Sequence, residues 1–122
     1  MITGFEDVTY DLNDKEIACI EGFRKSLSLR IGKSKAITSN EIIESYEKST
    51  GVKLAPARVR RIINCIRVNN LVPRLIGTQK GYYVAETPDE LSDYLQSLGQ
   101  RIREIQRVER SIAKQLMNWN ND

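Results

Sequence analysis

The sequence predicts a mostly helical α+β fold, with three helices, a wing of two or three strands and a long carboxy-terminal helix. Capping boxes, in which a capping residue is followed three positions later by Glu, begin at Asn13 and Thr38. Thr87 precedes a Pro and two acidic residues, which is a further helix start. The run Tyr82–Ala85 is aromatic and β-branched and follows a Gly-containing turn, so it predicts one strand of a hairpin.

The chain has 122 residues, which suits one domain with an appended element. Residues 1–12 show no clear period and are expected to form an arm. Residues 13–86 hold the predicted helices and hairpin and are expected to form the domain. Residues 87–118 are expected to form the long helix, and residues 119–122 a disordered tail.

The first helix is expected over Asp14–Ile31, where Gly32 stops it. Its predicted apolar stripe consists of Ile17, Ile20, Phe23, Leu27 and Ile31. A very short strand is expected at Ala36–Ile37. The second helix is expected to run to Thr50, with Ile42, Ile43 and Tyr46 facing inward, and Val52 and Leu54 are expected to be buried after it.

Pro56–Asn69 predicts a helix with two different faces. The apolar stripe consists of Val59, Ile62, Ile63 and Ile66. The opposite face carries Ala57, Arg61, Asn64 and Val68, flanked by Arg60 on one side and by Arg58 and Cys65 on the other. Arg and Asn can each form bidentate hydrogen bonds with purine edges, so this surface is a candidate reader of DNA. The alternative is a surface helix with solvated arginines.

A hairpin is expected after this helix, with Arg74–Ile76 in one strand, Gly77–Gly81 in the turn and Tyr82–Ala85 in the other strand. Tyr82 and Tyr83 point to opposite faces of a strand. One of them is therefore expected in the core and the other at the surface.

The residue types present argue against catalysis. The chain has no His, and its two Cys fit neither a zinc site nor a disulfide framework. No metal, cofactor or small-molecule ligand is expected, and an enzyme is not expected. No apolar run is long enough to span a membrane, so the expected compartment is the reducing cytoplasm.

Charge is distributed unevenly. Residues 1–23 carry a net charge of −5, residues 24–80 a net charge of +10, and residues 81–122 a net charge of −2. The positive charge is thus concentrated around Pro56–Asn69. A concentrated basic surface attracts polyanions, which favours a nucleic acid as the partner.

Leu and Ile recur at alternating spacings of four and three in the long helix, a heptad pattern. The stripe consists of Leu91, Leu95, Leu98, Ile102, Ile105, Ile112, Leu116 and Trp119, interrupted by Glu109. A small domain cannot cover a stripe about 45 Å long. We therefore expect Ile102, Ile105, Ile112 and Leu116 to pair with a second subunit. Glu109 would form interchain ion pairs with Arg103, Arg107 or Arg110. The alternative is a helix that folds back on its own domain.

The order helix, short strand, helix, helix and hairpin resembles a winged helix-turn-helix domain of bacterial and phage regulators, similar to the amino-terminal domain of biotin-operon-type repressors. The motifs that carry the resemblance are Thr38-Ser39-Asn40-Glu41, Gly51-Val52, Ala57–Ile63 and Gly77–Val84. Ala55 departs from the pattern, since such helices usually begin with Ser or Thr, and this weakens the cap by ~1 kcal/mol.

The resemblance implies that residues 56–69 enter the major groove of double-stranded DNA. It implies base contacts by Ala57, Arg60, Arg61 and Asn64, and backbone contacts by Arg58, Thr38 and Ser39. Lys33, Lys35 and Lys53 would add attraction that does not depend on DNA sequence. The wing at residues 77–81 would reach the minor groove or the backbone through Thr78, Gln79 and Lys80.

Together these features predict a sequence-specific DNA-binding protein, a small homodimeric transcriptional regulator associated with the nucleoid in the cytoplasm. A dimer would suit half-sites about one helical turn apart. Two alternatives stay open. One is a winged-helix adaptor that docks onto another protein, and the other is a phage or mobile-element protein for DNA replication or organisation.

Overall fold

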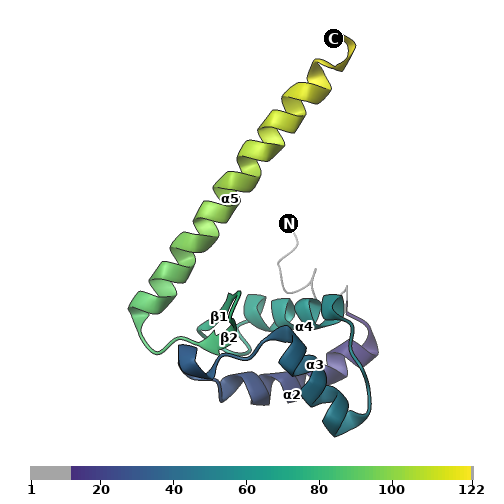
Figure 1. The fold of residues 1–122 in the computed structure, drawn as a ribbon, viewed down its shortest axis with the longest axis vertical. Helices are drawn as coiled ribbons and strands as arrows, with labels where there is room; N and C mark the ends of the chain where they lie inside the picture. Colours follow the sequence, from purple (N-terminus) through teal and green to yellow (C-terminus); the bar gives the residue numbers. More distant parts are fainter. Residues whose placement is uncertain (1–11, 122) are drawn as a thin grey trace. The chain divides into compact units, whose positions relative to one another are not determined.

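The computed structural model describes residues 12–121 and divides the chain into two compact units, Met1–Glu86 and Thr87–Asp122. The expected arm at residues 1–12 lies outside the described residues except for Leu12, which is buried. The mostly helical α+β prediction is confirmed, since the described residues form four α-helices and a two-stranded antiparallel sheet (Figure 1). The elements are α2 (Asp14–Ser28), η1 (Lys33–Lys35), α3 (Ser39–Thr50), α4 (Pro56–Val68), β1 (Leu75–Thr78), β2 (Gly81–Val84), α5 (Pro88–Met117) and η2 (Trp119–Asn121).

Helix α2 begins with the predicted capping box. Asn13 Oδ1 accepts a hydrogen bond from the Glu16 N–H at 2.8 Å, and Glu16 Oε1 accepts one from the Asn13 N–H at 3.0 Å. The predicted stripe is wrong at both ends, because Ile17 and Ile31 are exposed. The buried face of α2 consists of Glu16, Cys19, Phe23 and Leu27.

Helix α2 also ends three residues earlier than predicted. The Arg30 carbonyl accepts a hydrogen bond from the Val84 N–H at 2.7 Å, and the Gly32 N–H donates to the Val84 carbonyl at 2.9 Å. These bonds place Ile31 in a parallel bridge with Val84 of β2. The chain therefore leaves the helix after Ser28 because residues 30–32 pair with the hairpin.

Helix α3 matches its prediction closely. Thr38 and Glu41 form the expected capping box, with hydrogen bonds of 3.0 and 3.1 Å. Ile42 and Ile43 are buried, and Tyr46 is half-buried. Gly51 ends the helix with a φ of +77°, a left-handed conformation that Gly adopts at little cost.

Helix α4 supplies the centre of the core. Its side chains Val59, Ile62, Ile63 and Ile66 are 0–1 % exposed and pack in the interface with α2 and α3. Burying each contributes ~1.5–3 kcal/mol relative to an exposed position. Cys65 was predicted beside the outer face, and this is wrong because the side chain is buried. In the loop before α4, Leu54 is buried as predicted, whereas Val52 is exposed.

The hairpin has a shorter turn than predicted. Strands β1 and β2 pair from Leu75–Val84 to Thr78–Gly81, so only Gln79 and Lys80 form the turn. Thr78 stabilises it, because its Oγ1 accepts a hydrogen bond from the Lys80 N–H at 3.1 Å and donates one to the Gly81 carbonyl at 3.3 Å.

The expected strand at Ala36–Ile37 is reduced to one bridge. Ile37 and Tyr82 exchange backbone hydrogen bonds of 3.0 and 2.8 Å in antiparallel orientation. Because Ile37 lies directly before the cap of α3, this bridge places the hairpin beside the first turn of that helix.

The second unit consists mainly of α5. Thr87 and Glu90 form its capping box, with hydrogen bonds of 3.2 and 3.3 Å. The tail was predicted to be disordered, and this is wrong for Trp119–Asn121, which form the 3-10 turn η2. None of the helices within residues 12–121 is both long and apolar enough to cross a membrane.

Candidate nucleic-acid interface and pairing helix

The outward face of α4 forms the floor of a shallow hollow of about 440 Å³. The hollow is lined by Ala57, Arg60, Arg61, Ile63, Asn64, Arg67 and Tyr82. The buried stripe fixes the rotation of α4 about its axis, so Arg60, Arg61 and Asn64 are held at the surface. The structure thus brings together the four residues predicted to lie nearest the bases.

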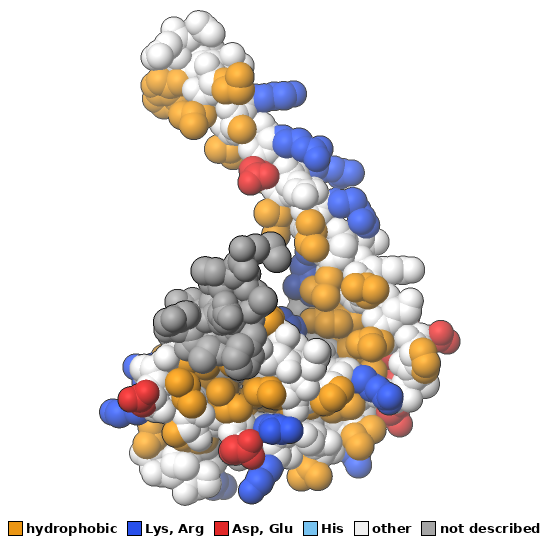
Figure 2. Space-filling model, turned by 180° about the vertical axis from the view of Figure 1, so that it is seen from behind, with side chains coloured by type: hydrophobic (Ala, Val, Ile, Leu, Met, Phe, Trp, Pro, Cys, Tyr) orange, Lys and Arg blue, Asp and Glu red, His pale blue; other side chains and the backbone are white. Residues whose placement is uncertain are grey.

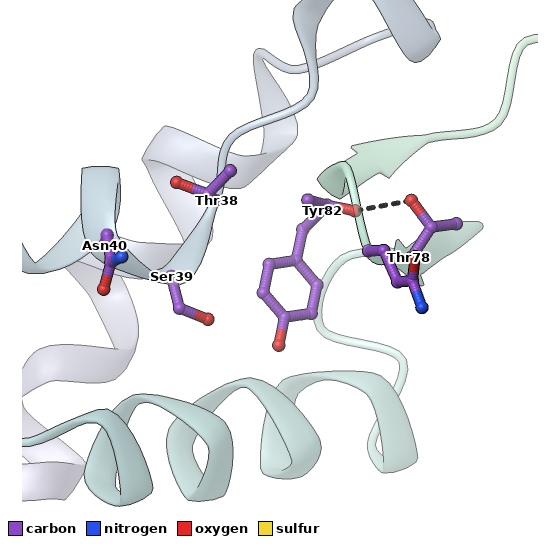
Figure 3. Close-up of a pocket in the computed structure, with 7 residues that line it drawn as sticks. Thr38, Ser39, Asn40, Thr78 and Tyr82 are labelled. Carbon is purple, nitrogen blue, oxygen red and sulfur yellow. Dashed lines mark hydrogen bonds between the residues drawn. The ribbon is translucent and has the colours of Figure 1, made fainter.

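A second hollow of about 340 Å³ lies between the first turn of α3 and the hairpin. It is lined by Thr38, Ser39, Asn40, Thr78, Gln79, Gly81 and Tyr82. Figure 3 shows Thr38, Ser39 and Asn40 on one side and Thr78 and Tyr82 of the hairpin on the other. The Ile37–Tyr82 bridge accounts for this arrangement. The predicted contacts at the start of α3 and at the wing therefore share one surface depression.

Tyr82 borders both hollows. Its ring extends from β2 beside Ser39 (Figure 3), and the side chain is half-buried, whereas Tyr83 is buried. The prediction that one tyrosine lies in the core is confirmed, and Tyr83 is that residue. A phenol ring at this boundary offers an apolar face and a hydroxyl to a bound ligand.

Arg67 and Tyr82 both have side chains above Gly77. A Cβ built on Gly77 would lie 3.0 Å from Arg67 Nη1 and 3.0 Å from Tyr82 Cε1. These two atoms are therefore separated by at most about 6 Å. The missing side chain of Gly77 leaves the space that the ends of both side chains border.

Helix α4 is strongly basic. It carries Arg58, Arg60, Arg61 and Arg67 and has no Asp or Glu. Since the apolar face is buried, this charge is displayed toward the exposed side. Such a surface produces a positive potential that attracts an anionic partner.

Glu41 modifies the electrostatics at the start of α3. Hydrogen bonds from the Thr38 backbone and side chain lower the pKa of this carboxyl below its ordinary value, and Arg30 adds to the effect. The carboxylate therefore carries a negative charge at the helix start. An anion bound in this hollow would have to rely on hydroxyl and amide groups farther out.

Several predicted contact residues line neither hollow. Arg58, Lys53 and Lys80 are exposed but lie outside the two linings, and Lys33 and Lys35 are exposed in η1. The structure adds Asn40, Arg67 and Tyr82 to the predicted set. Helical spacing could have identified Arg67, which follows Asn64 by three residues and Arg60 by seven.

The apolar stripe of α5 is exposed. Ile102, Ile105, Ile112 and Leu116 are 55–74 % exposed, and Glu109 lies among them. Figure 2 shows hydrophobic side chains along one side of the distal part of this helix and basic side chains along the other. An exposed apolar surface of this kind is typical of an interaction site.

Within the described part of the chain, no three His, Cys, Asp or Glu side chains are grouped as metal ligands. Comparison with protein-family models, curated proteins and solved structures finds no match to this chain.

Proposed function

We propose that this chain is a winged-helix protein that binds double-stranded DNA with sequence specificity and acts as a small, homodimeric transcriptional regulator at the nucleoid. The observation that carries the proposal is the outward face of α4. Arg60, Arg61, Asn64 and Arg67 line one hollow on a helix whose opposite face is buried. These are the side-chain types that read base edges in the major groove.

Helix α4 is the element proposed to enter the major groove, which has the width to admit an α-helix. Arg60, Arg61 and Asn64 project from its middle and would contact base edges. Arg58 is exposed in the first turn of the helix, Lys53 is exposed in the loop before it, and both would contact phosphates. This division agrees with the general pattern that phosphate contacts position a protein and base contacts specify the sequence.

The hairpin and the first turn of α3 would follow the backbone beside that groove. Thr38, Ser39, Thr78 and Gln79 offer hydroxyl and amide groups around one hollow. Lys80 lies in the exposed turn, where a cation can reach a phosphate or the adjacent minor groove. Contacts of this type would add affinity that falls as the salt concentration rises.

Helix α5 would join two copies of the chain. Its exposed isoleucines need a covering surface, and a second α5 offers the same stripe. Two α4 helices on one DNA molecule would multiply affinity without any new contact.

Selection of bound sequences from random duplexes tests the proposal. We expect enrichment of one motif, and Arg61→Ala should relax the preference at one position by ~1–3 kcal/mol. Arg24→Ala is the matched control, because it removes the same charge from an α2 residue that pairs with Glu21 and lines neither hollow. Absence of duplex binding in low salt would contradict the proposal.

A further inference from the structure

The apolar stripe of α5 follows two alternating heptad positions. Leu95, Ile102, Glu109 and Leu116 occupy one position, called a, and Leu91, Leu98, Ile105, Ile112 and Trp119 occupy the other, called d. Glu109 is therefore the single charged residue in the seam. Among residues 12–121, no cation lies within ion-pair distance of its carboxylate. Burying a carboxylate between two apolar helices is unfavourable unless a cation meets it there.

A parallel pair of α5 helices would leave Glu109 without a cation. In that arrangement each a position faces the same a position of the second copy, so two Glu109 carboxylates would oppose each other. The residue of the second copy that flanks this layer would be Val108, which is not basic. Like charges in this position would destabilise a parallel pair.

An antiparallel pair places each a position opposite a d position. Two antiparallel registers pair equally many apolar layers. One sets Ile105 opposite Glu109, which leaves the two Glu109 layers only about 6 Å apart. The other sets Leu91 opposite Leu116, Leu95 opposite Ile112, Ile102 opposite Ile105, and Leu98 opposite Glu109. The two Glu109 layers are then 11 residues apart along the pair, or about 16 Å. This register therefore separates the two like charges.

The residues beside Leu98 are suited to bind the Glu109 carboxylate of the second copy. Gly99 is on the side of the seam that Glu109 of the second copy would face, and a Gly weakens the interior of a helix. A Cβ built on Gly99 would lie 3.3 Å from Arg103 Nη1 and 4.0 Å from Arg103 Nη2, so the guanidinium folds back over this position. The bare surface of Gly99 thus lets the Arg103 guanidinium lie close to the helix, where it supplies the charge opposite to that of the carboxylate.

We propose that α5 pairs in antiparallel orientation with a second copy of the chain, with each Glu109 seated beside Gly99 and Arg103 of the other copy. This rests on the homodimer in the proposed function and specifies its geometry. In this register the two copies of Pro88 lie about 46 Å apart along the pair axis. The DNA-binding units would then attach at opposite ends of the pair, an arrangement suited to separated DNA sites.

Disulfide cross-linking tests the orientation without DNA. Leu91 and Leu116 are exposed, so Leu91→Cys and Leu116→Cys leave the core intact, and the native Cys19 and Cys65 are buried. We expect oxidation to link the two variants when they are mixed. Neither variant alone should form a disulfide-linked dimer, because its two introduced Cys residues would lie about 38 Å apart along the pair. Self-linking of Leu116→Cys, or a monomer in sedimentation at micromolar concentration, would overturn the proposal.

A charge reversal tests the ion pair. Glu109→Arg and Arg103→Glu should each raise the dissociation constant of the dimer. We expect a factor of about five for each ion pair, and the dimer contains two equivalent pairs. The double variant should restore dimerisation, whereas Glu104→Arg, on the outer side of the helix, should change little. A double variant no tighter than either single one would overturn the assigned contact. If the Cys variants cross-link as expected but the protein does not bind duplex DNA, the DNA-binding proposal alone would be overturned.

Discussion

The carbonyl oxygen of Ile37 lies where a side chain on Gly81 would begin. A Cβ built on Gly81 would be 2.5 Å from that oxygen, and the Gly81 φ of +121° is one that other residues rarely adopt. The same contact region contains the Ile37–Tyr82 bridge, which joins the hairpin to the start of α3. Gly81 therefore permits the close approach on which the second hollow depends.

Gly81→Ala is expected to destabilise the fold. The methyl group would meet backbone rather than a flexible side chain, and the positive φ adds strain, so we expect a loss of ~2–4 kcal/mol in the free energy of unfolding. Urea denaturation followed by far-UV circular dichroism measures it. A loss below about 1 kcal/mol would contradict this, because it would show that the backbone at the Ile37–Tyr82 bridge can shift to accommodate the methyl group.

Gly22→Ala is expected to stabilise the fold. Gly22 lies within α2, and nothing stands within 4 Å of a Cβ placed there. Alanine is a better helix former, so we expect a gain of ~0.5–1 kcal/mol in the same denaturation experiment. A loss of stability would indicate a contact at this exposed position.

Local signals predicted much of the first unit. The capping boxes at Asn13 and Thr38 are short-range hydrogen-bond patterns, and both form as expected. Four of the five buried residues of α4 were predicted correctly, because apolar residues at helical spacing indicate one buried face, and only Cys65 was misplaced. Elements whose ends are fixed by residues close in the sequence can therefore be predicted from the sequence alone.

The errors arise where distant segments meet. The end of α2 depends on hydrogen bonds between residues 30–32 and β2, and the length of the hairpin turn depends on the pairing of β1 with β2. The placement of Arg67 and Tyr82 above one residue depends on the bare surface of Gly77. Periodicity along one segment carries no information about such contacts, so the boundary between the two hollows could not be predicted.

Gly77→Ala is expected to weaken DNA binding while changing the stability of the fold only slightly. The new methyl group would press on the ends of the Arg67 and Tyr82 side chains, which can move, so the loss of stability should stay below about 1 kcal/mol. Displacing Arg67 should weaken duplex binding by ~1 kcal/mol, measured by fluorescence anisotropy. If the effect acts through Arg67, then Gly77→Ala should add nothing to Arg67→Ala.

Glu41 should make stability depend on pH. Its pKa is lowered in the folded state from the ordinary value of 4.5 by hydrogen bonds from Thr38. A lowered folded pKa contributes stability that is present above 4.5 and is lost as the pH falls through the folded value. Glu41→Gln keeps an oxygen acceptor but removes the titration. The difference in unfolding free energy between wild type and variant should therefore shrink from pH 7 toward acid, and a constant difference would contradict this.

Lys80 and Arg61 should affect DNA binding in different ways. Lys80 lies in the exposed hairpin turn, where a phosphate contact would be independent of sequence. Lys80→Ala should weaken binding to all duplexes about equally and reduce the slope of log K against log salt by about 1. Arg61→Ala should mainly reduce the ratio between the selected sequence and a duplex altered at one base pair. Titrations at several salt concentrations with both duplexes distinguish these effects, and an equal loss of specificity in both variants would contradict the assigned roles.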